Sequence, residues 1–448
     1  MCPAPRSPGA LFDKHGSTLS ATERRFMTIS GTHLLRRRLR ARPWDNMASL
    51  LGSLLLLASF GCGNSVVKQL EQVGATFQRN RQGELVGVNL ADTRIKDRDL
   101  APLAKISGIR QLSLSRTQIS DRGLAHLAEL EQLESLGLNG TTIDGSGLGR
   151  LSGLRELQSL GLGNTRLNDQ GLVHLESFDA LKSLTLHATT ITDAGMVHLA
   201  ALRQLESLGL SDTRISDAGL THLAGLENLR SLTLPARTTD HGLIQLENLT
   251  QLEALYLGDT QITDDGLAHL AHIVSLEMLL LPDQITDAGL IHLASLSNLK
   301  TLMPGGERIT DLGLSHLAAM PQLERLVLNG TRITDAGLKH VGALTRLYRL
   351  NLGLTDITGA GLAHLAELTN LKELDLSQTQ ITDTSLSSLR SLDRLLVLNL
   401  TDTALTDDGL DHLVQMKHLE VLSLGGTAIS SAGRERLKTA LPNCKIRQ

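Results

Sequence analysis

Histidines recur at one position of a repeated G-L-x-H-L segment, and such a column of imidazoles first suggests a metal site. A zinc site needs its ligand atoms within about 2.1 Å of one ion. The segments read as short helices whose axes would lie roughly 10 Å apart, and no Cys or Asp column completes a tetrahedral set. We therefore predict no metal and no cofactor, and expect each ring to pack beside leucines and bond to a neighbouring backbone group or water. The column comprises His126, His174, His198, His222, His269, His292, His316, His340, His364 and His412.

A column of aspartates precedes the same segments and raises the possibility of calcium, which takes about six to eight oxygen ligands. One carboxylate per segment is too few for that. Asp217 stands just before its predicted helix, where a carboxylate can accept hydrogen bonds from free backbone N–H groups. Helix capping is therefore the role we expect for Asp97, Asp121, Asp169, Asp193, Asp217, Asp264, Asp287, Asp311, Asp335, Asp383 and Asp407.

A hydrolase could be assembled from His187, Ser211 and Asp212, because the first two are predicted to occupy one position in adjacent strands. Asp212, however, follows the would-be nucleophile in the chain and does not lie behind the imidazole, and no glycine-rich oxyanion turn is apparent. The sequence also has no phosphate-binding glycine motif and no HExxH. We predict that the protein is not an enzyme; a hydrolase is the alternative.

These side chains belong to a repeated unit, of which residues 208–225, LGLSDTRISDAGLTHLAG, are a clear copy. Leu208 and Leu210 alternate with small residues, as in a short strand, and the leucines from Leu220 to Leu229 recur every three residues, as on a helical turn. A fixed period of 23 or 24 residues indicates a solenoid, in which neighbouring units stack to bury their apolar faces. The units begin at Val88, Leu112, Leu136, Leu160, Leu184, Leu208, Leu232, Leu255, Leu279, Leu302, Leu326, Leu350, Leu374, Leu398 and Leu422.

The pattern L-x-x-L-x-L-x-x-T-x-I-T-D-x-G-L resembles the leucine-rich repeat, most closely its cysteine-containing, ribonuclease-inhibitor-like class. Threonine, as at Thr117, Thr213 and Thr331, stands where that class often has Asn or Cys, and we expect its hydroxyl to bond to the neighbouring unit's backbone. The resemblance covers residues 88–433. It implies an α/β solenoid of about 15 repeats, a horseshoe or arc with a parallel β-sheet on the concave face and short helices on the convex face. It also implies ligand binding on the concave face and seldom catalysis.

Composition limits the classes of partner. Residues 62–448 carry 34 Lys and Arg against 44 Asp and Glu, a formal net charge of −10, which argues against binding to a nucleic-acid duplex. Aromatic residues make up 2% of the chain, too few for a base-stacking platform. The cysteines are Cys2, Cys62 and Cys444, so the repeats hold no disulfide framework.

The N-terminal region has the order of a secretory signal: arginines at 36–42, an apolar run at 50–60, then Gly61 and Cys62. The run is shorter than the roughly 20 apolar residues that span a bilayer. The segment LLLLASFGC resembles the lipobox of bacterial lipoproteins, which implies that Cys62 is acylated. We expect an extracytoplasmic, membrane-anchored lipoprotein of the periplasm or cell surface. An ordinary signal peptide and a secreted protein are the alternative, and Met1, Met27 and Met47 are all possible starts.

The chain divides by these signals into five parts. We predict a disordered extension plus signal peptide at 1–61, a lipid-anchor tether at 62–65, and an N-terminal cap with a helix and hairpin at 66–87. Leucine-rich repeats follow at 88–433 as one continuous body, and a C-terminal cap at 434–448. Caps are expected because a bare solenoid end exposes a sheet edge and a row of leucines.

The outward positions of the predicted strands change character along the chain. A serine column, Ser135, Ser159, Ser183, Ser207 and Ser231, gives way to larger side chains where the units beginning at Leu232, Leu279 and Leu302 lose their threonine and gain a proline. Neutral drift in surface loops would explain the change, and so would a binding patch. We predict ligand binding on the concave face at Tyr256, Met278, Leu280, Pro282, Met303, Pro304, Arg325, Arg349 and Asn351.

The sequence therefore predicts a non-catalytic, exported protein-interaction scaffold, monomeric, with a protein or peptide ligand or a glycan. No nucleic acid is expected, and membrane contact only through the lipid anchor. A cytoplasmic adaptor of the F-box-associated type is the alternative. Such an adaptor requires a helical domain that the residues before Val66 do not supply.

Overall fold

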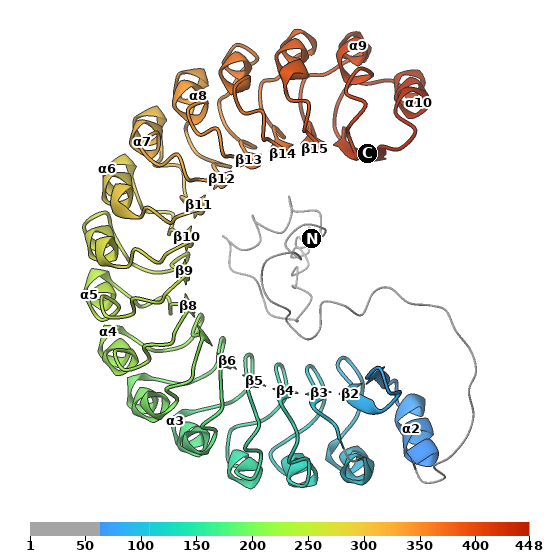
Figure 1. The fold of residues 1–448 in the computed structure, drawn as a ribbon, viewed down its shortest axis with the longest axis vertical. Helices are drawn as coiled ribbons and strands as arrows, with labels where there is room; N and C mark the ends of the chain where they lie inside the picture. Colours follow the sequence, from blue (N-terminus) through green and yellow to red (C-terminus); the bar gives the residue numbers. More distant parts are fainter. Residues whose placement is uncertain (1–62, 107, 448) are drawn as a thin grey trace, which may run out of the picture. The chain divides into compact units, whose positions relative to one another are not determined.

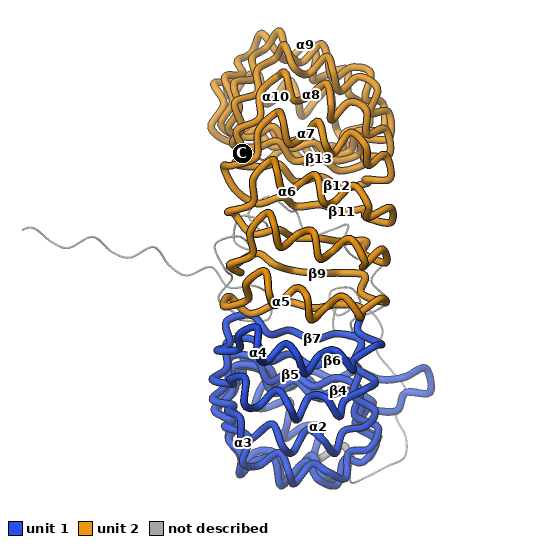
Figure 2. The backbone as a smooth tube through the Cα atoms, turned by 90° about the vertical axis from the view of Figure 1, so that its left-hand side faces the viewer, with its two compact units in different colours: residues 1–229 blue, residues 230–448 orange. Residues whose placement is uncertain are grey.

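The computed structural model describes residues 63–106 and 108–447, which form two compact units (Figure 2). Unit 1 ends at Leu229 and unit 2 begins at Arg230. Within each unit the strands line the inner side and the helices the outer side (Figure 1). The predicted leader at 1–61 and the predicted lipidation residue Cys62 lie outside the described residues.

Unit 1 starts with an α-helix and an antiparallel strand pair and continues with parallel strands. Helix α2 (Gly63–Gln72) precedes β1 (Thr76–Arg79), which pairs with β2 (Leu85–Asn89). Parallel to β2 follow β3 (Gln111–Ser113), β4 (Ser135–Gly137), β5 (Ser159–Gly161), β6 (Ser183–Thr185) and β7 (Ser207–Gly209). The α-helices are α3 (Asp169–Leu172) and α4 (Asp217–Leu220), and the 3-10 helices are η2 (Asp97–Lys105), η3 (Gly123–Leu127), η4 (Leu148–Leu151), η5 (Val173–Ser177), η6 (Asp193–Ala201) and η7 (Thr221–Leu223).

Unit 2 is parallel throughout. Its strands are β8 (Ser231–Thr233), β9 (Ala254–Tyr256), β10 (Met278–Leu280), β11 (Thr301–Met303), β12 (Arg325–Val327), β13 (Arg349–Asn351), β14 (Glu373–Asp375), β15 (Val397–Asn399), β16 (Val421–Ser423) and β17 (Lys445–Arg447). The α-helices are α5 (Asp240–Ile244), α6 (Asp287–Leu290), α7 (Asp311–Leu317), α8 (Asp335–Val341), α9 (Leu410–Leu413) and α10 (Ser431–Ala440). The 3-10 helices are η8 (Asp265–His272), η9 (Ile291–Ser295), η10 (Gly361–Leu365), η11 (Asp383–Ser391) and η12 (Asp407–Gly409).

The first leucine of each repeat forms the centre of its strand and pairs with the first leucine of the next. Leu136 pairs with Leu160 in unit 1, and Leu326 pairs with Leu350 in unit 2. These four side chains are at most 1% exposed, as are the helix leucines Leu172 and Leu338. Since burying one leucine is worth about 1.5–3 kcal/mol, the stacked leucine rows form the core of each unit.

The turn after each strand is closed by its threonine, but within its own repeat. The Thr117 hydroxyl donates to the Leu114 carbonyl at 2.6 Å, and Thr331 donates to Leu328 at 2.6 Å. The expectation that this hydroxyl bonds to the neighbouring repeat is therefore wrong. Successive repeats are joined here by backbone hydrogen bonds, as where the Arg116 N–H donates to the Asn139 carbonyl at 2.7 Å. The hydroxyl proton of the threonine is already donated to the carbonyl three residues back in its own repeat.

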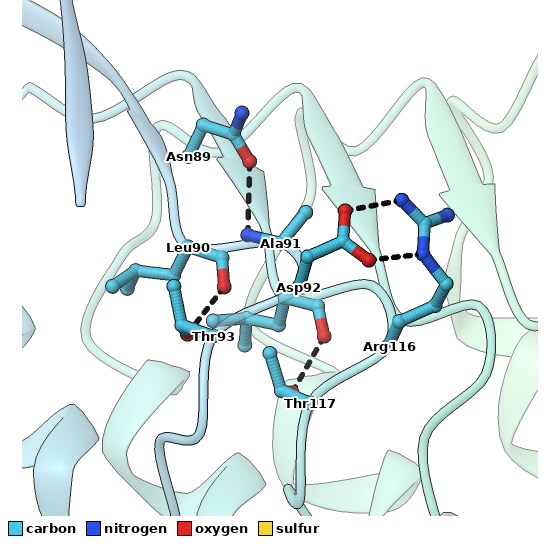
Figure 3. Close-up of polar contacts among 8 residues, drawn as sticks. Asn89, Leu90, Ala91, Asp92, Thr93, Arg116 and Thr117 are labelled. Atoms are coloured by element: carbon cyan, nitrogen blue, oxygen red, sulfur yellow. Dashed lines mark hydrogen bonds and ion pairs between the residues drawn. The ribbon is translucent and has the colours of Figure 1, made fainter. Parts of the chain in front are cut away.

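The residue before that threonine adopts a left-handed conformation in many turns. Arg116 has a φ of 57°, and its guanidinium makes two hydrogen bonds of 2.5 Å to Asp92, whose φ is 63° (Figure 3). Figure 3 also shows Asn89, which accepts from the Ala91 N–H at 3.0 Å. The hydrogen bonds from Arg116 lower the pKa of Asp92, against a smaller opposing effect of burial.

The aspartate column links successive repeats by hydrogen bonds. Asp193 accepts from the N–H and the hydroxyl of Ser216, both at 2.7 Å and both 23 residues ahead in the next unit. In most repeats the helix cap is the residue before the aspartate, as where the Thr192 hydroxyl accepts from the Ala194 N–H at 3.3 Å, and Asp264, which is itself a cap residue, makes no side-chain cap bond. Our prediction that the aspartates cap their own helices is therefore wrong. The same inter-unit bonds lower the pKa of Asp407, chiefly through the Ser430 hydroxyl.

The glycine of D-x-G-L is explained by the same carboxylate. A Cβ at Gly313 would lie 2.3 Å from Asp287 Oδ1, and one at Gly337 would lie 2.3 Å from Asp311 Oδ1. The aspartate of one unit occupies the space that a side chain at the glycine of the next would need. The aspartate of one T-D-x-G-L segment therefore packs against the glycine of the T-D-x-G-L segment in the next repeat.

Three prolines change this pattern in unit 2. Pro304 occupies the position of the second strand leucine, and because it has no N–H it cannot donate to the next strand. Strands β11 and β12 accordingly share only the pairs Thr301–Arg325 and Leu302–Leu326. Pro235 and Pro282 each follow the second leucine, and their carbonyls accept from Thr238 and Ile285 in altered turns.

Candidate ligand-binding face

The inner face of unit 2 presents two columns of side chains, from the first and third residues of each strand. The parallel register aligns Met278, Thr301, Arg325 and Arg349 in the first column. The third residues, which form the second column, include Tyr256, Leu280 and Met303. All of the predicted binding residues except the two prolines lie in these columns.

The apolar part of this face consists of Tyr256, Met278 and Leu280, on β9 and β10. All three side chains are half-buried. The Tyr256 hydroxyl lies 3.2 Å from the Met278 sulfur, so the ring is oriented along the sheet and toward the next strand. This cluster, which we call the apolar patch, offers a partner fixed and partly solvent-accessible apolar surface.

Four predicted binding residues are buried. Met303 lies in the same column as Leu280 but is only 6% exposed, so the expectation that it points outward to a ligand is not met. Asn351 is also 6% exposed, and its side-chain oxygen accepts from the Gly353 N–H at 2.9 Å. Pro282 and Pro304 are buried and shape the turns. These side chains support the face without presenting contact area.

The two predicted arginines are held in different ways. Arg349 forms an ion pair of 3.3 Å with Glu373, and the two side chains are 17% and 16% exposed. Arg325, its neighbour in the column, donates from Nε to the Tyr348 hydroxyl, and its guanidinium carbon lies 5.1 Å from the centroid of that ring. Among the described residues no carboxylate lies within 4.0 Å of the Arg325 nitrogens, and neither Nη has a protein acceptor. Arg325 is thus oriented but not neutralised.

Sequence reasoning missed Tyr348 and Glu373. Tyr348 stands one residue before its strand, outside the alternation that marked the two columns, although it is one of only two tyrosines in the chain. The rarity of tyrosine in this chain was the signal that could have marked Tyr348 as a candidate binding residue. Asp375 was missed as well: it is buried and accepts from Ser377 and from the Asn399 amide at 3.1 Å.

The serine column of unit 1 is a contrasting surface. Ser135, Ser159, Ser183 and Ser207 pair in register, and the other outward residue of each strand, two positions on, is glycine or threonine. Ser135 is buried and the other three are half-buried. These strands provide matched control positions because their outward side chains are small hydroxyls.

The histidine column lies on the outer helices. His198 Nδ1 lies 2.6 Å from Glu176 Oε1, and His269 Nδ1 lies 3.0 Å from Glu247 Oε1, so here the partner is a carboxylate of the preceding unit and not a backbone group or water. Within residues 63–106 and 108–447 no three His, Cys, Asp or Glu side chains are grouped to hold a metal ion. In the same residues no helix is long and apolar enough to cross a membrane.

Comparison with known proteins supports the architecture. A family model described as "Leucine Rich repeat" matches residues 248–271 and 367–389. A leucine-rich-repeat protein of Leptospira interrogans aligns with a TM-score of 0.52 and 21% identity, covering 79% of this chain and 100% of that one. The fold is a leucine-rich-repeat solenoid. Leucine-rich-repeat solenoids typically serve as protein-interaction domains, generally without catalytic activity.

Other leucine-rich-repeat structures align over similar lengths. An internalin of Listeria monocytogenes has a TM-score of 0.47 and 22% identity, covering 86% of this chain and 93% of that one. The Arabidopsis receptor kinase HAESA, in complex with the peptide hormone IDA and the co-receptor SERK1, has a TM-score of 0.48 and 16% identity, covering 82% of this chain and 70% of that one. A search of curated proteins found no match.

Proposed function

We propose that this leucine-rich-repeat protein is a non-catalytic scaffold that binds a protein or peptide partner on the inner face of unit 2. The observation that carries the proposal is the combination of an oriented, unneutralised Arg325 with the apolar patch two strands away. Binding energy at interfaces concentrates in aromatic, apolar and Arg side chains of this kind. A solvent-facing sheet without a partner would resemble the serine column of unit 1.

The proposal includes export. The basic region, the apolar run and Gly61–Cys62 favour an extracytoplasmic protein anchored by an acylated Cys62, and a secreted protein is the alternative. Helix α2 with the hairpin at the start of unit 1, and α10 with β17 at the end of unit 2, fit the roles of N-terminal and C-terminal caps. We place the repeats in the ribonuclease-inhibitor-like class, and expect a monomer.

Substitutions on the two faces test where the partner binds. Envelope and secreted proteins of the source organism are passed over the immobilised full chain, and a captured protein is then titrated against variants. Tyr256→Ala and Leu280→Ala should each weaken binding by more than about 1 kcal/mol, because they remove half-buried contact area.

The controls are Ser159→Ala and Ser183→Ala, which should change the affinity much less. All four variants should keep melting temperatures close to that of the wild type, because their side chains lie at the surface of the sheet. Loss of binding in the serine variants, with no effect at Tyr256 and Leu280, would place the site in unit 1 and refute the proposal.

A further inference from the structure

On the inner face of unit 2, next to the apolar patch, Arg325 has no carboxylate partner among the described residues. Arg349 is neutralised by Glu373, and Lys300 is paired with Glu277, whereas within residues 63–106 and 108–447 the Arg325 guanidinium is bonded and stacked only to Tyr348. The Tyr348 hydroxyl accepts from Nε and so orients the guanidinium. The two Nη groups have no acceptor among the described residues. An arginine edge of this kind binds a carboxylate through two parallel hydrogen bonds.

We propose that the ligand of this face is an extended peptide whose Asp or Glu side chain binds Arg325; this inference rests on the proposed binding function. The apolar patch lies two and three strands before Arg325. At about 4.8 Å per strand and 3.3 Å per residue, Tyr256 and Arg325 are separated by roughly 14 Å across the sheet and, because they lie in different columns, by about 7 Å along the strands. In an extended peptide, residues i and i+4 point to the same side and are about 13–14 Å apart.

The spacing therefore defines the ligand as apolar-x-apolar-x-acidic. The first apolar residue contacts Tyr256, the second contacts Met278 and Leu280, and the acid reaches Arg325. Beyond Arg325 the first column continues with the ion-paired Arg349 and Glu373 and then with the half-buried Val397 and Val421. Apolar surface therefore lies on both sides of the arginine, two strands before it on β10 and three strands after it on β15. A ligand that passes over both regions meets Arg325 with a side chain and not with its C-terminal carboxylate.

Affinity selection on the full chain tests this with two pools of random synthetic peptides of about 12 residues. One pool has C-terminal amides and the other has C-terminal acids. The amidated pool should be enriched in Asp or Glu four residues after an apolar residue. Arg325→Gln should lower the affinity of the selected peptides about tenfold or more, and replacing their acid by the corresponding amide should lower affinity in the wild type but not in Arg325→Gln.

The matched control is Arg332→Gln, an equal change of charge at an exposed arginine that lies 3.7 Å from Glu307. It should leave the affinity unchanged. Tyr348→Phe removes the acceptor of Arg325 Nε and keeps the ring. It should weaken binding of the acidic peptides without affecting their amide counterparts, and this separates positioning of Arg325 from general damage to the fold.

Three results would overturn the inference. Binding of the acid pool alone would assign Arg325 to a terminal carboxylate. Selected peptides that lack an acid and respond to Leu280→Ala but not to Arg325→Gln would refute the inference and leave the proposed function standing. No enrichment from either pool on the wild type would count against both.

Discussion

At the scale of single residues, one pair of departures from T-D-x-G-L is mutually compensating. Gly359 stands where other units have the aspartate, and Ser385 stands where the next unit would have its glycine. A Cβ at Gly359 would lie 1.9 Å from Ser385 Oγ. The Ser385 hydroxyl accepts from the Thr382 N–H at 3.1 Å, so it replaces the carboxylate that this N–H would otherwise meet.

This arrangement predicts strong coupling between the two positions. Gly359→Asp alone should lower the free energy of unfolding by about 1–3 kcal/mol through overpacking. Ser385→Gly alone should lower it by about 1–2 kcal/mol, because the Thr382 N–H loses its acceptor. The double variant rebuilds the regular aspartate–glycine pair, so urea unfolding should give a favourable coupling energy of about 1 kcal/mol or more. Additive effects of the two changes would show that they do not compensate.

At the scale of helices and strands, the aspartate bonds are the polar links between successive units. Asp287 at the start of α6 accepts from the Thr310 N–H at 2.8 Å and from its hydroxyl at 2.6 Å, at the start of α7. Each such carboxylate satisfies a donor at the beginning of the next helix. The helices are too short to be stable alone, so these links and the leucine rows must hold them.

Asp287→Ala should therefore lower the free energy of unfolding by about 1–3 kcal/mol, since it leaves the Thr310 N–H without an acceptor. The control is Asp393→Ala, at an exposed aspartate with no hydrogen bond or ion pair to the described residues. It should stay within about 0.5 kcal/mol of the wild type. Equal unfolding curves for the two variants would remove the structural role assigned to the aspartate column.

At the scale of the whole molecule, the proposed anchor at Cys62 decides where the protein resides. When the full chain is expressed in a bacterium, the wild type should fractionate with membranes and Cys62→Ala should not, because an acylated Cys62 is the proposed attachment. Cys444→Ala is the control and should remain with the membranes. Burial raises the pKa of the Cys444 thiol, so that residue is a poor candidate for modification. Identical fractionation of wild type and Cys62→Ala would contradict the anchor.

The sequence alone determined the solenoid, its repeat positions and which strand residues form the buried leucine rows. The predicted start Val88 lies in β2, and those from Leu112 to Leu422 are the central residues of their strands, as at Leu136, Leu160, Leu326 and Leu350. This works because apolar periodicity decides which side chains must be buried, whatever the neighbouring unit contains. The candidate binding columns follow from the same alternation, although ligand binding there remains a prediction.

Only the tertiary structure decided the partners of the polar side chains and the exposure of individual face residues. Thr117 bonds within its own unit, whereas Asp193 bonds to the next, and the spacing of the repeat is the same for both. Met303 and Leu280 share a column, yet only Leu280 remains accessible. The physical reason is that the partner of a polar side chain, and the exposure of a side chain on the face, depend on atoms about 23 residues away in the chain. The positions of those atoms are set by how successive repeats stack.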